Sequence, residues 1–286
     1  MIAKPSDDQI IFRPEFIQAS QGRLFSLFHF PRVTKTKQHA VVFFPPFAEE
    51  MNKSRRMIAL QARAFAGLGL PVIVVDLFGT GDSEGDFSQA TVDIWRNDFD
   101  TIIRYVQEQG YTHLTLWGLR FGALLLMDLL RDRPDIAGVE NIIFWQPVLQ
   151  GEMMMTQFLR LRLAADMMSS AEKVTTKDMR QLLAEGNELE VAGYTLSPDL
   201  VFAIDGLSMK TWQPEKNYNM FWFDVVSNSN RPAPVVNQQV QDTLTLAGMH
   251  VNADKVVGDP FWSTAEISTI PELIDKTSAV FTSLQR

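Results

Sequence analysis

The stretch LTLWGLRFGALLL, residues 114–126, changes from a strand pattern to a helix pattern within a few residues. An apolar run leads into a turn bounded by Gly118 and Gly122, and an apolar helix pattern then continues to Arg133. Glycines are needed on both sides when a strand turns so sharply into a helix that neighbouring side chains would collide. The pattern predicts a nucleophile elbow, and Arg120 is its central residue.

Strand and helix patterns alternate on both sides of this elbow. The predicted strands are residues 16–19 and 24–30, which form a hairpin, and then 39–44, 72–76, 114–117, 141–145, 221–226 and 251–257. The predicted helices include residues 55–68, 92–109 and 121–133. With the elbow, this order predicts an α/β-hydrolase fold, a doubly wound and mostly parallel sheet with an N-terminal antiparallel hairpin.

A helical insertion interrupts this alternation. Residues 150–210 contain helical patterns rich in methionine but no buried strand. These methionines are Met153, Met154, Met155, Met167, Met168 and Met179. We therefore expect residues 1–149 and 211–286 to form the hydrolase core, and residues 150–210 to form a helical cap over the edge of the sheet.

The composition excludes several classes of function. A formal net charge of −8 disfavours nucleic acids and anionic membranes as partners. The chain has no cysteine, which excludes disulfides and thiolate chemistry. The opening residues lack an apolar signal core, and no apolar run approaches the length of a membrane span, so we expect a cytoplasmic protein. Phosphate-binding, dinucleotide and metal-ligand motifs are absent, so we expect no cofactor.

Arginine cannot perform the chemistry for which an elbow is normally built. Its guanidinium stays protonated and has no lone pair with which to attack a carbonyl group. Arg120 at a helix N-terminus could instead bind an anionic ligand, or it could form a structural ion pair with Glu49, Glu50 or Asp259.

The other two members of a catalytic triad are missing from their expected places. The loop after the last strand, GDPFW at residues 258–262, contains no histidine, and the loop after residue 226 contains no carboxylate before Asp242. We expect all four histidines, which are His29, His39, His113 and His250, at the opposite edge of the sheet.

The ends of the strands supply the remaining candidates, because ligands of such sheets bind outside the carboxyl ends of the strands. The candidate catalytic groups are Arg120, Glu49, Glu50 and Asp259. The candidate ligand-binding residues are Arg120, Phe47, Ala48, Phe121, Gln146 and Trp262. Asn52, Lys53 and Arg55, at the start of the next helix, could meet an anion or be solvated.

One motif is a decoy. GDSEG at residues 81–85 matches the G-x-S-x-G pattern of serine hydrolases. Ser83 nevertheless lies in a long acidic loop rather than between a strand and a helix, so we interpret it as a loop-capping residue.

Several runs together resemble a known family. PPFAEEMNKSRR at residues 45–56, DLFGTGDS at 76–83, LWGLRFG at 116–122, AGYTL at 192–196 and DPFW at 259–262 are similar to the hydrolase-like proteins of exosortase A systems, second type. The acidic loop is shared more widely, with serine hydrolases of the aminopeptidase and monoglyceride lipase kind. The resemblance implies a bacterial cytoplasmic protein encoded with exopolysaccharide synthesis and protein-sorting machinery.

Three hypotheses follow, with the nucleophilic serine replaced by Arg120 in each. In the first, the protein is an enzyme acting on an ester, thioester or acyl group, with water activated by Glu49, Glu50 or Asp259 and the oxyanion stabilised by Arg120. In the second, it is a non-catalytic protein that binds an anionic saccharide or acyl ligand. In the third, it is a scaffold for exopolysaccharide-biosynthesis proteins, and Arg120 is locked in an internal salt bridge.

Overall fold

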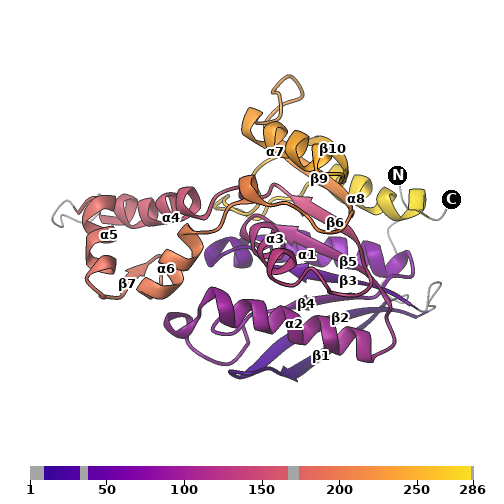
Figure 1. The fold of residues 1–286 in the computed structure, drawn as a ribbon, viewed down its shortest axis with the longest axis horizontal. Coiled ribbons are helices and arrows are strands. Elements are labelled where there is room, and N and C mark those ends of the chain that lie inside the picture. Colours follow the sequence, from indigo (N-terminus) through magenta and orange to yellow (C-terminus); the bar gives the residue numbers. More distant parts are fainter. Residues whose placement is uncertain (1–9, 33–37, 167–173, 285–286) are drawn as a thin grey trace.

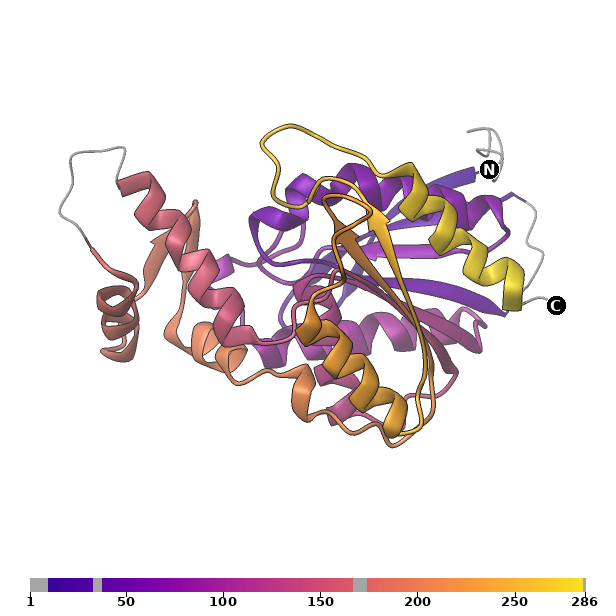
Figure 2. The ribbon, with the colours of Figure 1, turned by 90° about the horizontal axis from the view of Figure 1, so that it is seen from above.

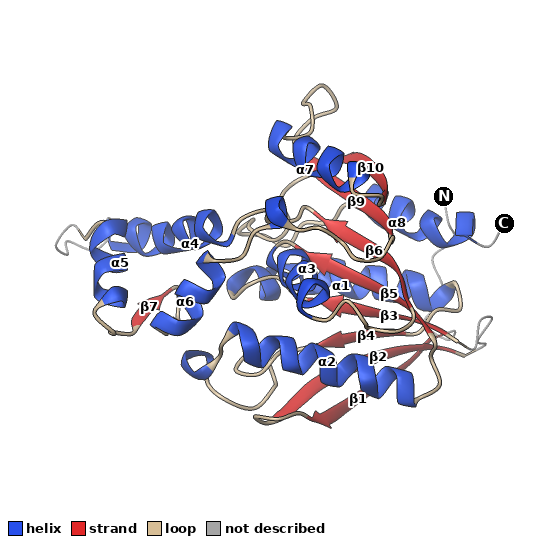
Figure 3. Cartoon of the chain, in the orientation of Figure 1, coloured by secondary structure: helices blue, strands red, loops and turns tan. Residues whose placement is uncertain are grey.

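The computed structural model describes residues 10–32, 38–166 and 174–284. Outside these ranges lie residues 1–9, which belong to the stretch without an apolar signal core, and two methionines of the expected cap, Met167 and Met168. The described residues form an eight-stranded sheet with helices on both faces and further helices beyond the carboxyl ends of its parallel strands (Figures 1 and 3).

The sheet has the predicted arrangement. In chain order its strands are β1 (Ile10–Gln18), β2 (Arg23–Pro31), β3 (His39–Phe44), β4 (Val72–Val75), β5 (His113–Leu119), β6 (Val139–Trp145), β9 (Asn219–Val226) and β10 (His250–Val257). Across the sheet the order is β1-β2-β4-β3-β5-β6-β9-β10. The β1–β2 hairpin is antiparallel and β2 runs antiparallel to β4, whereas the other neighbours are parallel. The doubly wound sheet with an N-terminal antiparallel hairpin is confirmed.

Helices cover both faces of the sheet, which is why its central strands are continuous apolar runs. The main helices are α1 (Glu49–Gly67), α2 (Val92–Glu108), α3 (Phe121–Asp132), α7 (Val235–Leu246) and α8 (Pro271–Leu284), and a short 3₁₀ helix, η2 (Phe87–Gln89), precedes α2. Figure 2 shows α1 and α8 on one face and α2, α3 and α7 on the other. Two cores result, one around Phe65 and Trp117 and one around Trp95 and Phe99.

The segment between β6 and β9 lies beyond the carboxyl ends of the parallel strands (Figures 1 and 3). It contains α4 (Gly151–Asp166), α5 (Thr176–Ala184), β7 (Leu189–Val191), β8 (Tyr194–Leu196), α6 (Pro198–Asp205) and the 3₁₀ helix η3 (Met209–Thr211). Strands β7 and β8 form a two-stranded antiparallel hairpin that the sequence pattern did not predict. Its turn residues, Ala192 and Gly193, both have positive φ, as a tight type I′ turn requires.

Candidate functional site

Arg120 stands at the turn between β5 and α3, as predicted. It is the N-cap of α3 and has φ 54° and ψ −119°, a conformation that costs on the order of 1–3 kcal/mol for a residue other than glycine. A Cβ atom on Gly122 would lie 2.1 Å from the carbonyl oxygen of Phe44, and one on Gly118 would lie 2.6 Å from the Cα of Ala123. Both glycines are therefore required by the close approach of backbone to backbone.

A residue with positive φ follows each of three neighbouring strands. Ala48 lies four residues after the end of β3 with φ 49°, whereas Arg120 and Gln146 directly follow β5 and β6 with φ 54° and 41°. The strain at Gln146 is held in place by hydrogen bonds to β9, in which its backbone N–H donates to Phe223 and its side-chain oxygen accepts from Val225 N–H. Strained backbone of this kind is concentrated at functional sites, so this rim of the sheet is the candidate site.

Arg120 is paired with Glu50. The guanidinium Nε lies 3.2 and 3.3 Å from the two carboxylate oxygens of Glu50, and Nη2 lies 3.2 Å from Oε1. Both side chains are mostly buried, with exposed fractions of 16% and 19%. Burial raises the pKa of Glu50, and the neighbouring Arg120 charge opposes that rise. Of the three possible counter-ions, the structure brings only Glu50 to Arg120 among the described residues.

This pairing depends on a helix that starts earlier than expected. Helix α1 begins at Glu49, six residues before the predicted start at Arg55, so both carboxylates lie in its first turn. The helix dipole favours negative charge there. The start was missed because Ala48, the N-cap, has no side chain that can cap a helix. Glu49 pairs with Lys53 at 3.6 Å, one turn further along α1.

The loop after β10 contributes an aromatic ring rather than a carboxylate. The ring of Trp262 lies over the guanidinium of Arg120, with 5.2 Å between its centroid and Cζ, which is within the range of a cation–π contact. Asp259 is exposed, and the structure does not bring it to Arg120.

Two cavities meet at Arg120. The smaller, of about 130 Å³, is lined by Phe47, Glu49, Glu50, Arg120, Met154, Gln157, Phe158, Leu161 and Ser263. The larger, of about 320 Å³, is lined by Arg120, Gln146, Pro147, Val148, Leu149, Gln150, Met153, Met154, Gln157, Pro234, Val236 and Asn237. Arg120, Met154 and Gln157 belong to both, so helix α4 and the elbow form their common wall.

Two of the predicted ligand-binding residues lie behind these walls. The ring of Phe121 is buried and packs against Phe47 and Trp95, and Phe121 is not among the described residues that line either cavity. Ala48 is also buried, and it contributes the strained turn before α1. Phe47 and Gln146 do line the cavities.

The structure places all four histidines away from this rim. His39, His113 and His250 are the first residues of parallel strands, and His29 pairs with Val72 at the start of β4. The four therefore lie toward the amino ends of the parallel strands, at the edge opposite Arg120.

A buried carboxylate that the sequence analysis did not single out lies in β9. Asp224 accepts hydrogen bonds from Trp222 Nε1 at 3.0 Å and Asn237 Nδ2 at 2.7 Å. Burial raises its pKa. Asn237 lines the larger cavity, so Asp224 positions one of the amides of that wall.

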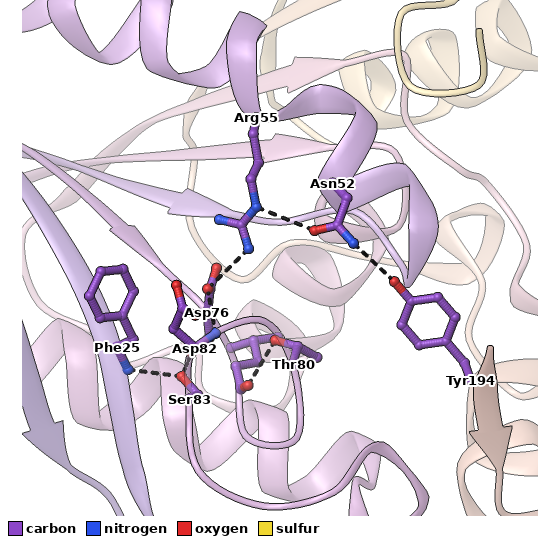
Figure 4. Close-up of polar contacts among 9 residues, drawn as sticks. Phe25, Asn52, Arg55, Asp76, Thr80, Asp82, Ser83 and Tyr194 are labelled. Carbon is purple, nitrogen blue, oxygen red and sulfur yellow. Dashed lines mark hydrogen bonds and ion pairs between the residues drawn. The ribbon is translucent and has the colours of Figure 1, made fainter. Parts of the chain in front are cut away.

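Ser83 holds the acidic loop in place, as Figure 4 shows. Its hydroxyl donates to the carbonyl of Asp76 and accepts from the backbone N–H of Phe25. The Asp76 carboxylate accepts from Arg55 Nη2 at 3.1 Å and from Asp82 N–H at 3.0 Å. The interpretation of Ser83 as a loop-capping residue agrees with these contacts.

We expect Ser83→Ala to lower the free energy of unfolding by about 1–2 kcal/mol, because it leaves the N–H of Phe25 without its acceptor. Urea denaturation measures this effect. A Ser83→Ala protein as stable as the wild type would show that these contacts do not hold the loop in place.

The polar residues at the start of α1 are paired rather than free for an anion. Arg55 Nε donates to Asn52 Oδ1, and Asn52 Nδ2 donates to the hydroxyl of Tyr194 in β8, each at 3.3 Å (Figure 4). The Asn52–Tyr194 contact ties α1 to the β7–β8 hairpin, and the Arg55–Asp76 pair ties α1 to the residue after β4.

Further observations bear on possible partners. Among the described residues, no group of three or more acidic or histidine side chains is arranged to hold a metal ion. None of the helices in the described ranges combines the length and the apolar character needed to cross a membrane.

Solved structures with the same fold include several hydrolases. Est1E from Butyrivibrio proteoclasticus, solved with bound ferulic acid, aligns with a TM-score of 0.66 at 14% identity, covering 95% of this chain and 98% of that one. Proline iminopeptidase from Mycobacterium smegmatis aligns with a TM-score of 0.61 at 14% identity, covering 95% and 97%. Mouse alpha/beta hydrolase domain-containing protein 10 aligns with a TM-score of 0.58 at 13% identity, covering 95% and 99%. At these identities the likeness shows the fold.

No curated protein sequence matches the chain. The family model for serine aminopeptidase, S33, matches residues 35–194, which is more than half of the 286 residues. That range contains α1, the acidic loop, the elbow and β7, and it ends at the first residue of β8. The chain therefore belongs to the serine aminopeptidase S33 family of α/β hydrolases.

Proposed function

We propose that this chain is a non-hydrolytic member of its family, which binds an anionic ligand with an acyl or saccharide part in the two cavities beside Arg120. The observation that carries the proposal is the ion pair between Arg120 in the elbow and Glu50 in α1, with Arg120 lining both cavities. An arginine in the place of the serine cannot form an acyl-enzyme intermediate. It can bind an anion through charge-assisted hydrogen bonds.

The form of the cavities supports ligand binding. Their walls are mainly apolar, with a few amides and the Arg120–Glu50 pair at the junction, which is the usual composition of a small-molecule site. Helix α4 contributes Met153, Met154 and Phe158 to these walls. In this proposal, residues 150–210 act as the cap that shields the ligand from water.

The cellular setting in the proposal comes from the sequence runs that resemble exosortase-associated hydrolase-like proteins. On that basis the protein works in the bacterial cytoplasm beside exopolysaccharide-synthesis proteins, and its ligand is an intermediate of surface-polysaccharide assembly. The runs that carry this part are the one at residues 45–56 and the elbow at residues 116–122.

A thermal-shift screen tests the binding function. Carboxylates, acyl thioesters, sugar phosphates and p-nitrophenyl esters are each added to the wild type, to Arg120→Ala and to Arg55→Ala, and product is measured in parallel. A ligand at about 100 times its Kd should stabilise the wild type by about 3 kcal/mol. Arg120→Ala should weaken binding at least tenfold, because it removes a charge-assisted contact of about 1.5–3 kcal/mol.

Arg55→Ala is the matched control, because it removes the same charge from a guanidinium that is paired with Asp76 and does not line the cavities. Binding should survive in this variant. Turnover that disappears in Arg120→Ala would replace the binding function with catalysis, and a screen without any stabilising ligand would favour a scaffold.

A further inference from the structure

The guanidinium of Arg120 has two hydrogen-bonding edges, and they are used unequally. One edge, made by Nε and Nη2, holds the carboxylate of Glu50 at 3.2–3.3 Å. On the other edge, Nη1 reaches the backbone carbonyl of Gln146 at 3.5 Å, the upper limit for a hydrogen bond. An arginine carries five N–H donors in a planar fork. The second edge can therefore donate hydrogen bonds to a ligand carboxylate while the first keeps its bonds to Glu50.

The larger cavity lies on the Gln146 side of Arg120. Both residues line it, together with the amides of Gln150, Gln157 and Asn237. The rest of its wall is apolar and comes from the segment after β6, from α4 and from the start of α7, chiefly Pro147, Val148, Met153, Met154, Pro234 and Val236. A ligand held at the second edge of Arg120 would thus place its remaining atoms against apolar side chains.

The charges around the pair limit what the ligand can carry. Arg120 is the one cation among the described residues that line the two cavities, and Glu50 already balances it. Glu49 lies on the same helix turn and is balanced by Lys53 at 3.6 Å. The other linings, from α4 and from Ser263 after β10, are uncharged. A dianion such as a phosphate monoester would find no second cation here.

A monoanion on Arg120 would put two carboxylates on one guanidinium. Like charges at such a site favour protonation of one of the two groups. Glu50 is the group best placed to take the proton, because burial already raises its pKa.

We infer that the ligand is a monocarboxylic acid with an apolar chain, held by the second edge of Arg120 in the larger cavity, and that Glu50 takes up a proton when it binds. The inference rests on the proposed function and names its ligand class. It makes anion binding dependent on pH through one identified side chain.

Calorimetric titration with octanoate tests the inference in the full-length protein. Titrations at pH 6 and pH 8, each in two buffers with different heats of ionisation, count the protons taken up on binding. Octanol and octyl phosphate, which have the same chain length, serve as the neutral and the phosphate comparison compounds. We expect octanoate to bind with uptake of up to one proton, so that its Kd rises by up to about tenfold per pH unit. Octanol should bind at least tenfold more weakly than octanoate at pH 6. Octyl phosphate, which is a dianion at pH 8, should bind at least tenfold more weakly than octanoate at that pH.

Glu50→Gln should remove the proton uptake and bind octanoate at pH 8 at least tenfold more tightly than the wild type. Asp205→Asn is the control, because Asp205 forms a comparable partly buried pair with Arg180, outside both cavities. It should keep the proton uptake of the wild type.

The contrary results show whether the inference fails alone or together with the proposed function. Octanol binding as tightly as octanoate, or octanoate binding without proton uptake, would overturn the inference and leave the binding function standing. The same holds if neither compound binds but another ligand of the thermal-shift panel does. If nothing in either experiment binds, the proposed function fails together with the inference.

Discussion

Replacing Gly122 by alanine is expected to lower the free energy of unfolding by about 3 kcal/mol or more. The new Cβ would lie 2.1 Å from the carbonyl oxygen of Phe44 and 2.6 Å from that of Pro45. Both obstacles are backbone atoms of the neighbouring strand end, so no rotation of a side chain can relieve the clash. For a protein of this size the loss corresponds to a fall in Tm of roughly 6–12 °C. Urea denaturation at equilibrium measures it.

Gly206→Ala provides the matched control for the Gly122 substitution. Gly206 ends α6 with φ −71° and ψ −13°, and its added Cβ would come no closer than 3.4 Å to the carbonyl of Ala203. We expect this variant to stay within about 1 kcal/mol of the wild type. A Gly122→Ala protein as stable as Gly206→Ala would show that the elbow is not as tight as the structure has it.

The sheet could be predicted because its strands are buried on both faces. Strands β3 and β4 are uninterrupted apolar runs of the kind that only a covered parallel sheet explains. The elbow was equally clear, because Gly118 and Gly122 bracket a strand-to-helix transition. Segments that depend on few residues were harder. Strands β7 and β8 have three residues each. So short a run shows too little alternation of apolar and polar residues to distinguish a strand from a loop inside a helical segment.

The sequence predicts which residues lie near Arg120 but not which of them contact it. Three counter-ions for Arg120 were possible from the sequence alone, and the choice among them depends on where α1 begins. Because α1 starts at Glu49 without a capping side chain, Glu50 faces Arg120 and Glu49 faces Lys53. The contact between Trp262 and Arg120 depends on the path of the loop after β10, and no local sequence pattern encodes that path.

Asp98 is expected to make the protein less stable as the pH rises from about 4 to about 6. Its side chain is buried in α2, where one carboxylate oxygen accepts from Phe78 N–H and the other has no hydrogen-bond partner among the residues that the structure describes. Burial raises the pKa of Asp98 from 3.8 to about 6, against the opposing effect of the Phe78 hydrogen bond. The native state therefore holds this proton more tightly than the unfolded state, and stability falls as the proton is lost. A shift of this size corresponds to about 3 kcal/mol.

Asp98→Asn isolates this effect, because asparagine keeps an acceptor for Phe78 N–H and does not ionise. We expect the stability of the variant relative to the wild type to improve by about 3 kcal/mol between pH 4 and pH 7.5, measured by urea denaturation at each pH. Asp93→Asn, on the same helix, is the control, because its carboxylate is 80% exposed and its ion pair with Arg96 lies at the surface, where such a pair contributes about 0–1 kcal/mol. Its difference from the wild type should change by no more than about 1 kcal/mol over that range. If the Asp98→Asn difference is just as flat, Asp98 is not the buried acid described above, and the pH dependence of stability must come from other groups.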